Sequence, residues 1–176
     1  MTIRRTFATL TLVILTAAGC GGDDNPTGLS ASCGTLGSFS GNATGVGAGA
    51  LAGCSFYNVS QSSNGTFFGL SLVSGNFTTF THSVTLARSG GRPPAGTYNV
   101  GTGTSDMTGT VFVDAGDRSF FLTSGTITIT TSASDNLVGS LNVTGTELGG
   151  SATISVTGNF AAKCQTGSGT GVTFSC

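Results

Sequence analysis

The stretch "GTITITTSASDNLVGSLNVTGTELGGSATISVTGNF", residues 125–160, contains three segments in which apolar and small polar residues alternate. The apolar residues that share a parity are Ile127 and Ile129 in the first segment, Leu137, Leu141 and Val143 in the second, and Ile154, Val156 and Phe160 in the third. Successive side chains of a β-strand point to opposite faces, so this alternation predicts strands with one buried and one solvated face.

The same alternation recurs elsewhere after residue 33, for example in residues 65–73 and 77–87, and no part of this region has a helical period. Threonine on one face and branched or aromatic residues on the other suit a sheet that is buried on one side. We therefore predict an all-β antiparallel domain of about nine or ten short strands. Its architecture is either a two-sheet sandwich or a flattened up-and-down barrel.

The composition excludes one large class of partner. Charged residues make up only 7% of the chain, against about 25% in typical soluble domains. After residue 20 there are four basic and seven acidic side chains, which gives a net charge of −3. Nucleic-acid binding needs a basic surface, so no nucleic-acid partner is expected.

The N-terminus reads as an export signal. Arg4 and Arg5 precede an apolar stretch that is too short to span a bilayer and suits the apolar region of a signal peptide. The residues Ala17, Ala18, Gly19 and Cys20 resemble the lipobox of bacterial lipoproteins. That resemblance implies that residues 1–19 are removed and that Cys20 receives diacylglycerol and palmitate. The stretch "RRTF" also resembles the twin-arginine signature, but the match is partial, so the general secretory route is favoured and the twin-arginine route stays open.

The residues after Cys20 predict a tether followed by one domain. Residues 20–32 are rich in turn formers and lack apolar periodicity, which is typical of a flexible linker. A coil of this length averages about 19 Å end to end. Gly21 stands where aspartate would signal inner-membrane retention in enteric lipoproteins, so the resemblance implies the outer membrane, with either face possible. Residues 33–176 suit a single β domain.

The cysteines predict two disulfides. If Cys20 is lipidated, the other four cysteines form an even set in an oxidising compartment, and they are Cys33, Cys54, Cys164 and Cys176. If residues 165–171 form a hairpin loop, Cys164 lies opposite Val172 and roughly 13 Å from Cys176, too far for a bond. Of the three possible connectivities we therefore favour the two with long-range bridges between the chain ends, such as Cys33–Cys164 with Cys54–Cys176. The chain has no C-x-x-C pair, and no metal site is expected.

No catalytic constellation is found in the sequence. His82 is the only histidine, so a Ser–His–Asp or Cys–His centre would have to use it. It shares parity with Phe80, Val84 and Leu86, which favours a buried histidine in a strand. We expect no enzymatic activity, no catalytic residue and no cofactor. Phe67 and Phe121 are out of phase with their apolar neighbours and are the best candidates for an exposed contact or a second packed face.

Four motifs resemble those of a family of bacterial lipoproteins of unknown function. They are "PPAGTY" (93–98), "SGTITIT" (124–130), "VGSLNVTG" (138–145) and "VTGNFAAKC" (156–164), and the likeness covers roughly residues 65–164. The resemblance implies a fold and no assigned chemistry.

These observations give two functional expectations. The first is a membrane-anchored extracytoplasmic lipoprotein with a non-enzymatic structural or protein-binding role in the cell envelope, whose protein partner is unknown. The alternative is a barrel that binds a small apolar ligand. A cavity lined by phenylalanines would favour the alternative, and a solid core would favour the first.

Overall fold

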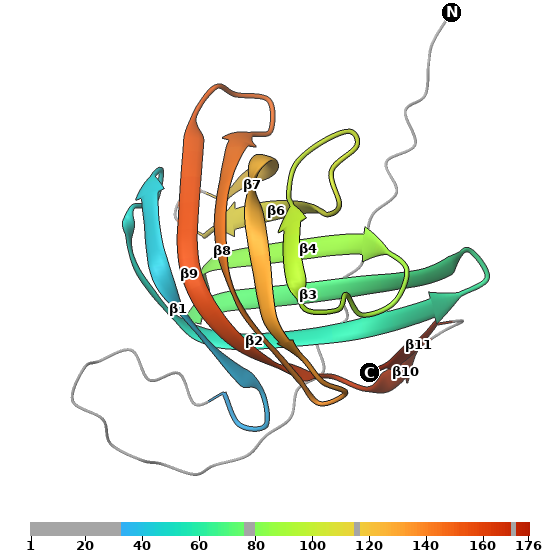
Figure 1. Ribbon diagram of the computed structural model, residues 1–176. Coiled ribbons are helices and arrows are strands. Elements are labelled where there is room, and N and C mark those ends of the chain that lie inside the picture. The colour runs from blue at the N-terminus through green and yellow to red at the C-terminus, as the bar shows by residue number, and fades with distance from the viewer. Residues whose placement is uncertain (1–32, 76–79, 115–116, 170–171) are drawn as a thin grey trace, which may run out of the picture.

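The computed structural model describes residues 33–75, 80–114, 117–169 and 172–176 (Figure 1). These residues form strands and no helix, so none of them could cross a membrane as a helix. The strands are β1 (Gly37–Gly45), β2 (Gly49–Ser62), β3 (Gly65–Gly75), β4 (Phe80–Ser89), β5 (Gly96–Asn99), β6 (Thr108–Val113), β7 (Arg118–Ser132), β8 (Asn136–Glu147), β9 (Thr153–Cys164), β10 (Gly167–Gly169) and β11 (Val172–Ser175). The predicted all-β class is confirmed.

Eight of these strands form a closed antiparallel barrel. Around the barrel the order is β1, β2, β3, β4, β6, β7, β8 and β9, and β1 pairs with both β2 and β9. In Figure 1 the strands β1, β9, β8 and β7 run across the direction of β2, β3 and β4. Neighbours in the barrel follow one another along the chain, with β5 as the exception, and this is the up-and-down arrangement.

The alternative of a two-sheet sandwich is wrong. Alternation along a strand shows which residues face inward, but a sandwich and a barrel share that pattern. The difference lies in the pairing of β1, whose residues Gly37–Ala43 pair with β2 and whose residues Ser38–Gly45 pair with β9. This double pairing removes both free edges of the sheet.

The strands are longer than predicted, and β7 shows why. Its inward residues change parity, from Phe120 and Leu122 to Ile127 and Ile129, across a register shift between Leu122 and Ser124. Such a bulge inserts one residue and bends the strand. The alternation alone splits β7 into two predicted strands at this point, although the chain forms one strand of 15 residues.

Two short elements, β5 and the hairpin of β10 and β11, are added to the closed barrel. β5 pairs with Thr126–Ile129 of β7, and β6 pairs with Arg118–Phe121, so β5 and β6 share one side of β7. The hairpin of β10 and β11 pairs through β11 with Val59–Gln61 of β2, beyond the part of β2 that pairs with β1. The long strand β2 therefore keeps hydrogen-bonding partners on both sides.

The two ends of the barrel differ. At one end, here called the four-hairpin end, lie the connections β1–β2, β3–β4, β6–β7 and β8–β9. At the other, the Cys33 end, the described chain begins at Cys33 and the hairpin of β10 and β11 lies beside β2.

Both disulfides are local, so the expected long-range connectivity is wrong. Cys33 bonds to Cys54, and Cys164 bonds to Cys176, with Cα–Cα distances of 5.3 and 5.7 Å. The predicted loop at 165–171 is too long, because β10 and β11 already pair from Gly169↔Val172 to Gly167↔Phe174. Continued by two residues, that register brings residue 176 next to Cys164.

Cys33 reaches Cys54 through a tight turn. The Leu36 N–H donates to the Cys33 carbonyl at 2.9 Å, which folds the segment back just before β1. In β1, Ser38 pairs directly with Cys54 of the neighbouring strand. The disulfide therefore ties the first described residue to a buried position in the middle of β2.

Candidate functional site

The barrel interior is filled by side chains. The inward-facing apolar residues are at most 6% exposed, and most are 0–2% exposed. The largest of them are Tyr57, Phe68, Phe120, Leu70, Leu72, Leu86, Met107, Leu122, Ile127, Ile129, Leu137 and Ile154. A void large enough for a water molecule would leave accessible area on the side chains around it. The interior is thus a packed core.

Two phenylalanines fill space above glycines on neighbouring strands. Phe160 pairs with Gly139, and a Cβ on Gly139 would lie 2.8 Å from the tip of the Phe160 ring. Phe39 covers Gly158 in the same way, with its Cε2 2.8 Å from a Cβ built there. The rings therefore occupy the volume that ordinary side chains at these glycines would take.

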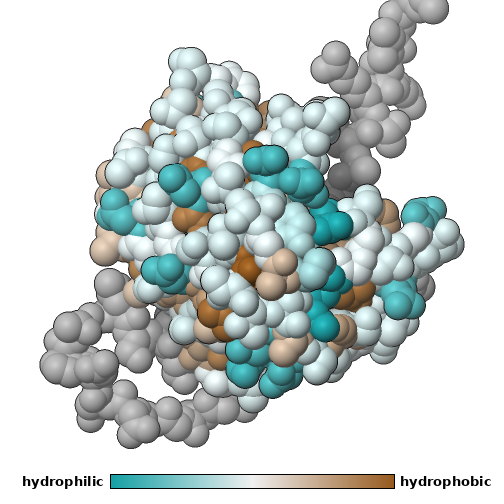
Figure 2. Space-filling view, viewed as in Figure 1, coloured by the Kyte–Doolittle hydropathy of each residue, from teal (hydrophilic) through white to brown (hydrophobic). Residues whose placement is uncertain are grey.

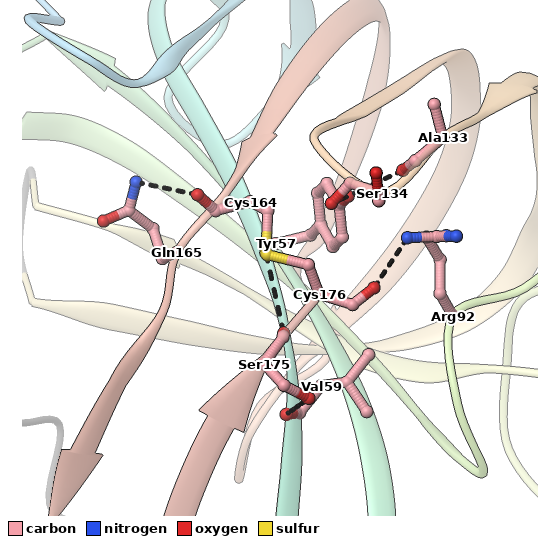
Figure 3. Close-up of a disulfide and its surroundings, with 9 residues drawn as sticks. All are labelled: Tyr57, Val59, Arg92, Ala133, Ser134, Cys164, Gln165, Ser175 and Cys176. Atoms are coloured by element: carbon pink, nitrogen blue, oxygen red, sulfur yellow. Dashed lines mark hydrogen bonds between the residues drawn. A yellow bond between two sulfur atoms is a disulfide. The ribbon is translucent and has the colours of Figure 1, made fainter.

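Tyr57 closes the interior at the Cys33 end (Figure 3). Its side chain is fully buried, and its hydroxyl lies 2.9 Å from the Ala133 carbonyl and 2.8 Å from the Ser134 carbonyl. The single hydroxyl proton is shared between these two acceptors of the β7–β8 turn. Tyr57 thereby joins β2 to the opposite side of the barrel.

Arg92 lies beside this tyrosine and holds the chain end. Its Nε donates to Ser132 Oγ at 3.1 Å. Its Nη1 donates to the main-chain oxygen of Cys176 at 2.6 Å, and Figure 3 shows this second bond. Burial raises the pKa of the Tyr57 hydroxyl, while the Arg92 guanidinium partly opposes this rise and Asp135 adds to it. At neutral pH Tyr57 is therefore a protonated donor that keeps the turn closed.

His82 lies inside the barrel at the four-hairpin end. It is 6% exposed, its Nδ1 lies 3.2 Å from Thr81 Oγ1, and its buried Nε2 has no hydrogen-bond partner of acceptable geometry among the described residues. Gly47 in the β1–β2 turn has φ of +68°, and a Cβ there would lie only 2.8 Å from Nε2. The turn covers the ring, which agrees with the predicted buried histidine.

Acidification is expected to destabilise the barrel through His82. Burial lowers the pKa of this histidine, and the backbone of Gly47 opposes that shift in part. The unfolded chain protonates near the usual pKa of about 6.5. It then binds more protons than the folded chain, so stability is full above this pH and falls as the pH drops toward the folded pKa.

Urea unfolding at about pH 7.5 and about pH 5.5, on either side of the unfolded pKa, measures this loss. Since His82 is the only histidine, the His82→Leu variant should lose the pH dependence in that window. An unchanged dependence in the variant would contradict the assignment.

The outer surface carries two shallow hollows. One, of about 580 Å³, lies beside Cys33 and Leu36, with Gly53 of β2 and Ala161 of β9 in its wall. The other, of about 370 Å³, crosses β1, β8 and β9 and shares Ser38 and Ala161 with the first. Their linings mix small and hydroxyl-bearing residues with asparagines, a few larger apolar residues such as Leu36 and Val138, and Lys163, which lies 3.9 Å from Asp135. Figure 2 shows a face of mostly intermediate hydropathy.

Exposed apolar side chains occur at the positions that the phase analysis predicted. Phe67 is 40% exposed and Phe121 is 50% exposed, which bears out an exposed contact at both positions in place of a second packed face. Leu148, at 63%, is exposed as well, and no sequence pattern predicts it. Phe80 also departs from expectation. Its parity with His82 predicts an inward side chain, but the Phe80 ring contacts the outward-facing Phe112, with 5.6 Å between the ring centres. The pairing of β3 with β4 shifts register at Ser74/Gly75, opposite the start of β4, and this shift accompanies the change of face.

A two-point ion pair lies at the four-hairpin end. Arg118 donates from Nε and Nη2 to the two carboxylate oxygens of Glu147, at 2.6 and 2.7 Å. Its guanidinium also lies over the Phe120 ring, 5.5 Å from the centroid. Hydrogen bonding lowers the pKa of Glu147 and raises that of Arg118. The partners are 29 residues apart, so no local sequence signal reveals them.

The predicted site residues are therefore brought together only as disulfides. Cys20, the signal peptide of residues 1–19 and the tether of residues 20–32 lie outside the described residues. Within the described part of the chain, no group of three or more His, Cys, Asp or Glu side chains could hold a metal ion. Comparisons with protein-family models, curated proteins and solved structures found no match.

Proposed function

We propose that this chain is a membrane-anchored extracytoplasmic lipoprotein whose barrel is a non-catalytic scaffold that binds a protein partner in the cell envelope. The observation that carries the proposal is the packed interior, in which the inward apolar side chains are at most 6% exposed. A scaffold without free internal volume must act through its outer surface. The exposed side chains and hollows of that surface are the contacts it can offer.

The only imidazole supports a non-catalytic role. A general base must come within hydrogen-bonding reach of the proton that it removes. The Nε2 of His82 is buried beneath the Gly47 turn, and its Nδ1 lies 3.2 Å from Thr81 Oγ1 of its own strand. Substrate could not reach this ring unless the turn moved away.

A small apolar ligand is the second candidate, and a closed barrel is compatible with it. Closed eight-stranded barrels are just wide enough either to be filled by side chains or to hold one small ligand. In this barrel Phe39, Phe120 and Phe160 occupy the interior at 0–3% exposure. A ligand would have to displace such rings, at the cost of their packing.

The disulfide of Cys33 suits an anchored protein. The proposed tether reaches the domain at Cys33, which is bonded to Cys54 at a 1% exposed position of β2. Tension on the tether therefore acts on β2 through the disulfide, and not only on the start of β1 between β2 and β9.

The proposed anchor makes a direct prediction. Acylation of Cys20 supplies more than the two lipid signals needed for stable attachment, so Cys20→Ser should abolish palmitate labelling and shift the chain out of the outer-membrane fraction. Labelling with radioactive palmitate followed by membrane fractionation measures both effects. A Cys20→Ser chain that is still labelled and cleaved before residue 20 would exclude the anchor.

The carrier alternative is tested on the full-length protein purified from its membrane. Organic extraction and mass spectrometry should find only the anchor's acyl chains and no further apolar molecule in a one-to-one ratio. A stoichiometric apolar compound protected inside the barrel would replace the scaffold proposal with the carrier.

A further inference from the structure

Four apolar side chains gather on the outer face of the four-hairpin end: Phe80, Phe112, Phe121 and Leu148, here called the aromatic patch. Phe112 of β6 pairs with Ser119 of β7, and Leu148 donates its N–H to the Ser119 carbonyl at 2.9 Å. Phe112 and Leu148 therefore flank Ser119.

The remaining two members extend this cluster along and across the sheet. Phe121 lies two residues further along β7 on the outward face, paired with Thr110 and Thr146. Phe80 extends the cluster through its ring contact with Phe112.

The aromatic patch leaves apolar side-chain surface in contact with water. Phe121 and Leu148 are 50% and 63% exposed, and threonines on either side of Phe121 leave its ring uncovered. Isolated exposed apolar residues are ordinary, but a contiguous set of large ones marks interaction surfaces. Phe67, the third large exposed residue, lies away from the patch between Ser60 and Ser89.

The charges beside the patch are negative. Asp114 follows Phe112 by two residues and Asp117 precedes Ser119 by two, and both carboxylates are exposed. Neither makes an ion pair among the described residues, whereas the nearby Glu147 is already neutralised by Arg118. The surface therefore combines aromatic rings with two acids that lack cationic partners.

We propose that the aromatic patch docks a segment of an envelope protein that presents apolar side chains next to arginine or lysine. The proposal rests on the scaffold function and names the surface that would perform it. The apolar side chains would cover Phe121 and Leu148, and the cations would pair with Asp114 and Asp117. Exposed aromatic anchors with a complementary charged rim are typical of protein interfaces.

The charges favour this occupant over two others. An anionic lipid surface would be repelled by Asp114 and Asp117, and the patch lies at the barrel end opposite Cys33, where the chain enters the domain. A second copy on a two-fold axis would bring the same two acids of each copy together. A basic protein segment has neither disadvantage.

The test places a photo-reactive benzoylphenylalanine at Phe121 in the full-length chain in its native cells. The matched control carries the same group at Phe67, which is similarly exposed on another face. We expect a crosslinked protein from position 121 and not from position 67. Mass spectrometry should map the link to a segment with arginine or lysine within a few residues.

The second part of the test neutralises the two acids beside the aromatic patch. Asp114→Asn with Asp117→Asn should reduce the crosslink at least five-fold, and asparagine tolerates the positive φ of 51° at Asp117. The inference is overturned by crosslinks to lipid, by crosslinks to a second copy, by equal yields at positions 67 and 121, or by insensitivity to the neutralised acids. A partner that crosslinks only at Phe67 would refute docking at the aromatic patch but would not contradict the scaffold function. An apolar ligand inside the barrel would remove the scaffold function itself.

Discussion

Phe160→Ala is expected to lower the free energy of unfolding by about 3–5 kcal/mol, among the largest effects of any single substitution in the barrel. The ring is 3% exposed, faces inward from β9 and fills the space above Gly139. Glycine leaves no side chain that could move into the vacated volume, so the cavity cannot collapse easily. Urea unfolding followed by circular dichroism measures the change.

The matched control for Phe160 is another phenylalanine of the same chain. Phe121 is 50% exposed on the outer face of β7, and Phe121→Ala should change the stability by no more than about 0.5 kcal/mol. Equal losses for the two variants would show that Phe160 does not lie in a packed interior.

Removal of the Cys33–Cys54 disulfide is expected to destabilise the domain by about 2–4 kcal/mol. The bond closes a loop with a sequence separation of 21 residues and links the turn before β1 to a buried position of β2. The variant Cys33→Ala with Cys54→Ala should therefore unfold at a markedly lower urea concentration. Without the bond, the start of β1 is held mainly by its pairing with β2 and β9.

Peptide mapping and a comparison variant test the assignment of this disulfide. Peptide mapping without reduction should recover Cys33 linked to Cys54 and Cys164 linked to Cys176, and a Cys33–Cys164 peptide would contradict the structure. The comparison variant is Cys164→Ala with Cys176→Ala, which opens a loop with a separation of only 12 residues. Its expected loss is smaller by a few tenths of a kcal/mol, because chain entropy grows only slowly with loop length.

The fold class could be predicted because side-chain alternation is a local property. Ile127, Ile129, Val156 and Phe160 face inward as their parity predicts. The sequence left both a barrel and a sandwich open, because the choice depends on the pairing of β1 with β9, more than 100 residues away in the chain. The bulge in β7 also escaped prediction, because a change of parity reads in the sequence as a break between strands.

For the candidate sites, too, local features could be predicted and contacts between distant segments could not. The burial of His82 and the exposure of Phe67 and Phe121 follow from phase within a single strand, and the structure confirms all three. The cysteine connectivity failed because it required the register of β10 and β11. Contacts between distant segments, such as Tyr57 with the β7–β8 turn, leave no local pattern in the sequence.

The proposed scaffold function requires a filled barrel, which leaves the outer surface as the part of the protein that can act. The most direct test titrates benzene into residues 33–176 and into the same domain with Phe160→Ala, and follows the methyl signals of Ile129 and Val156 by NMR. Apolar cavities bind benzene, whereas a packed core has no room for it. The account predicts no change in the wild-type signals and saturable shifts in the variant. Saturable shifts of the same interior methyl groups in the wild-type domain would contradict it.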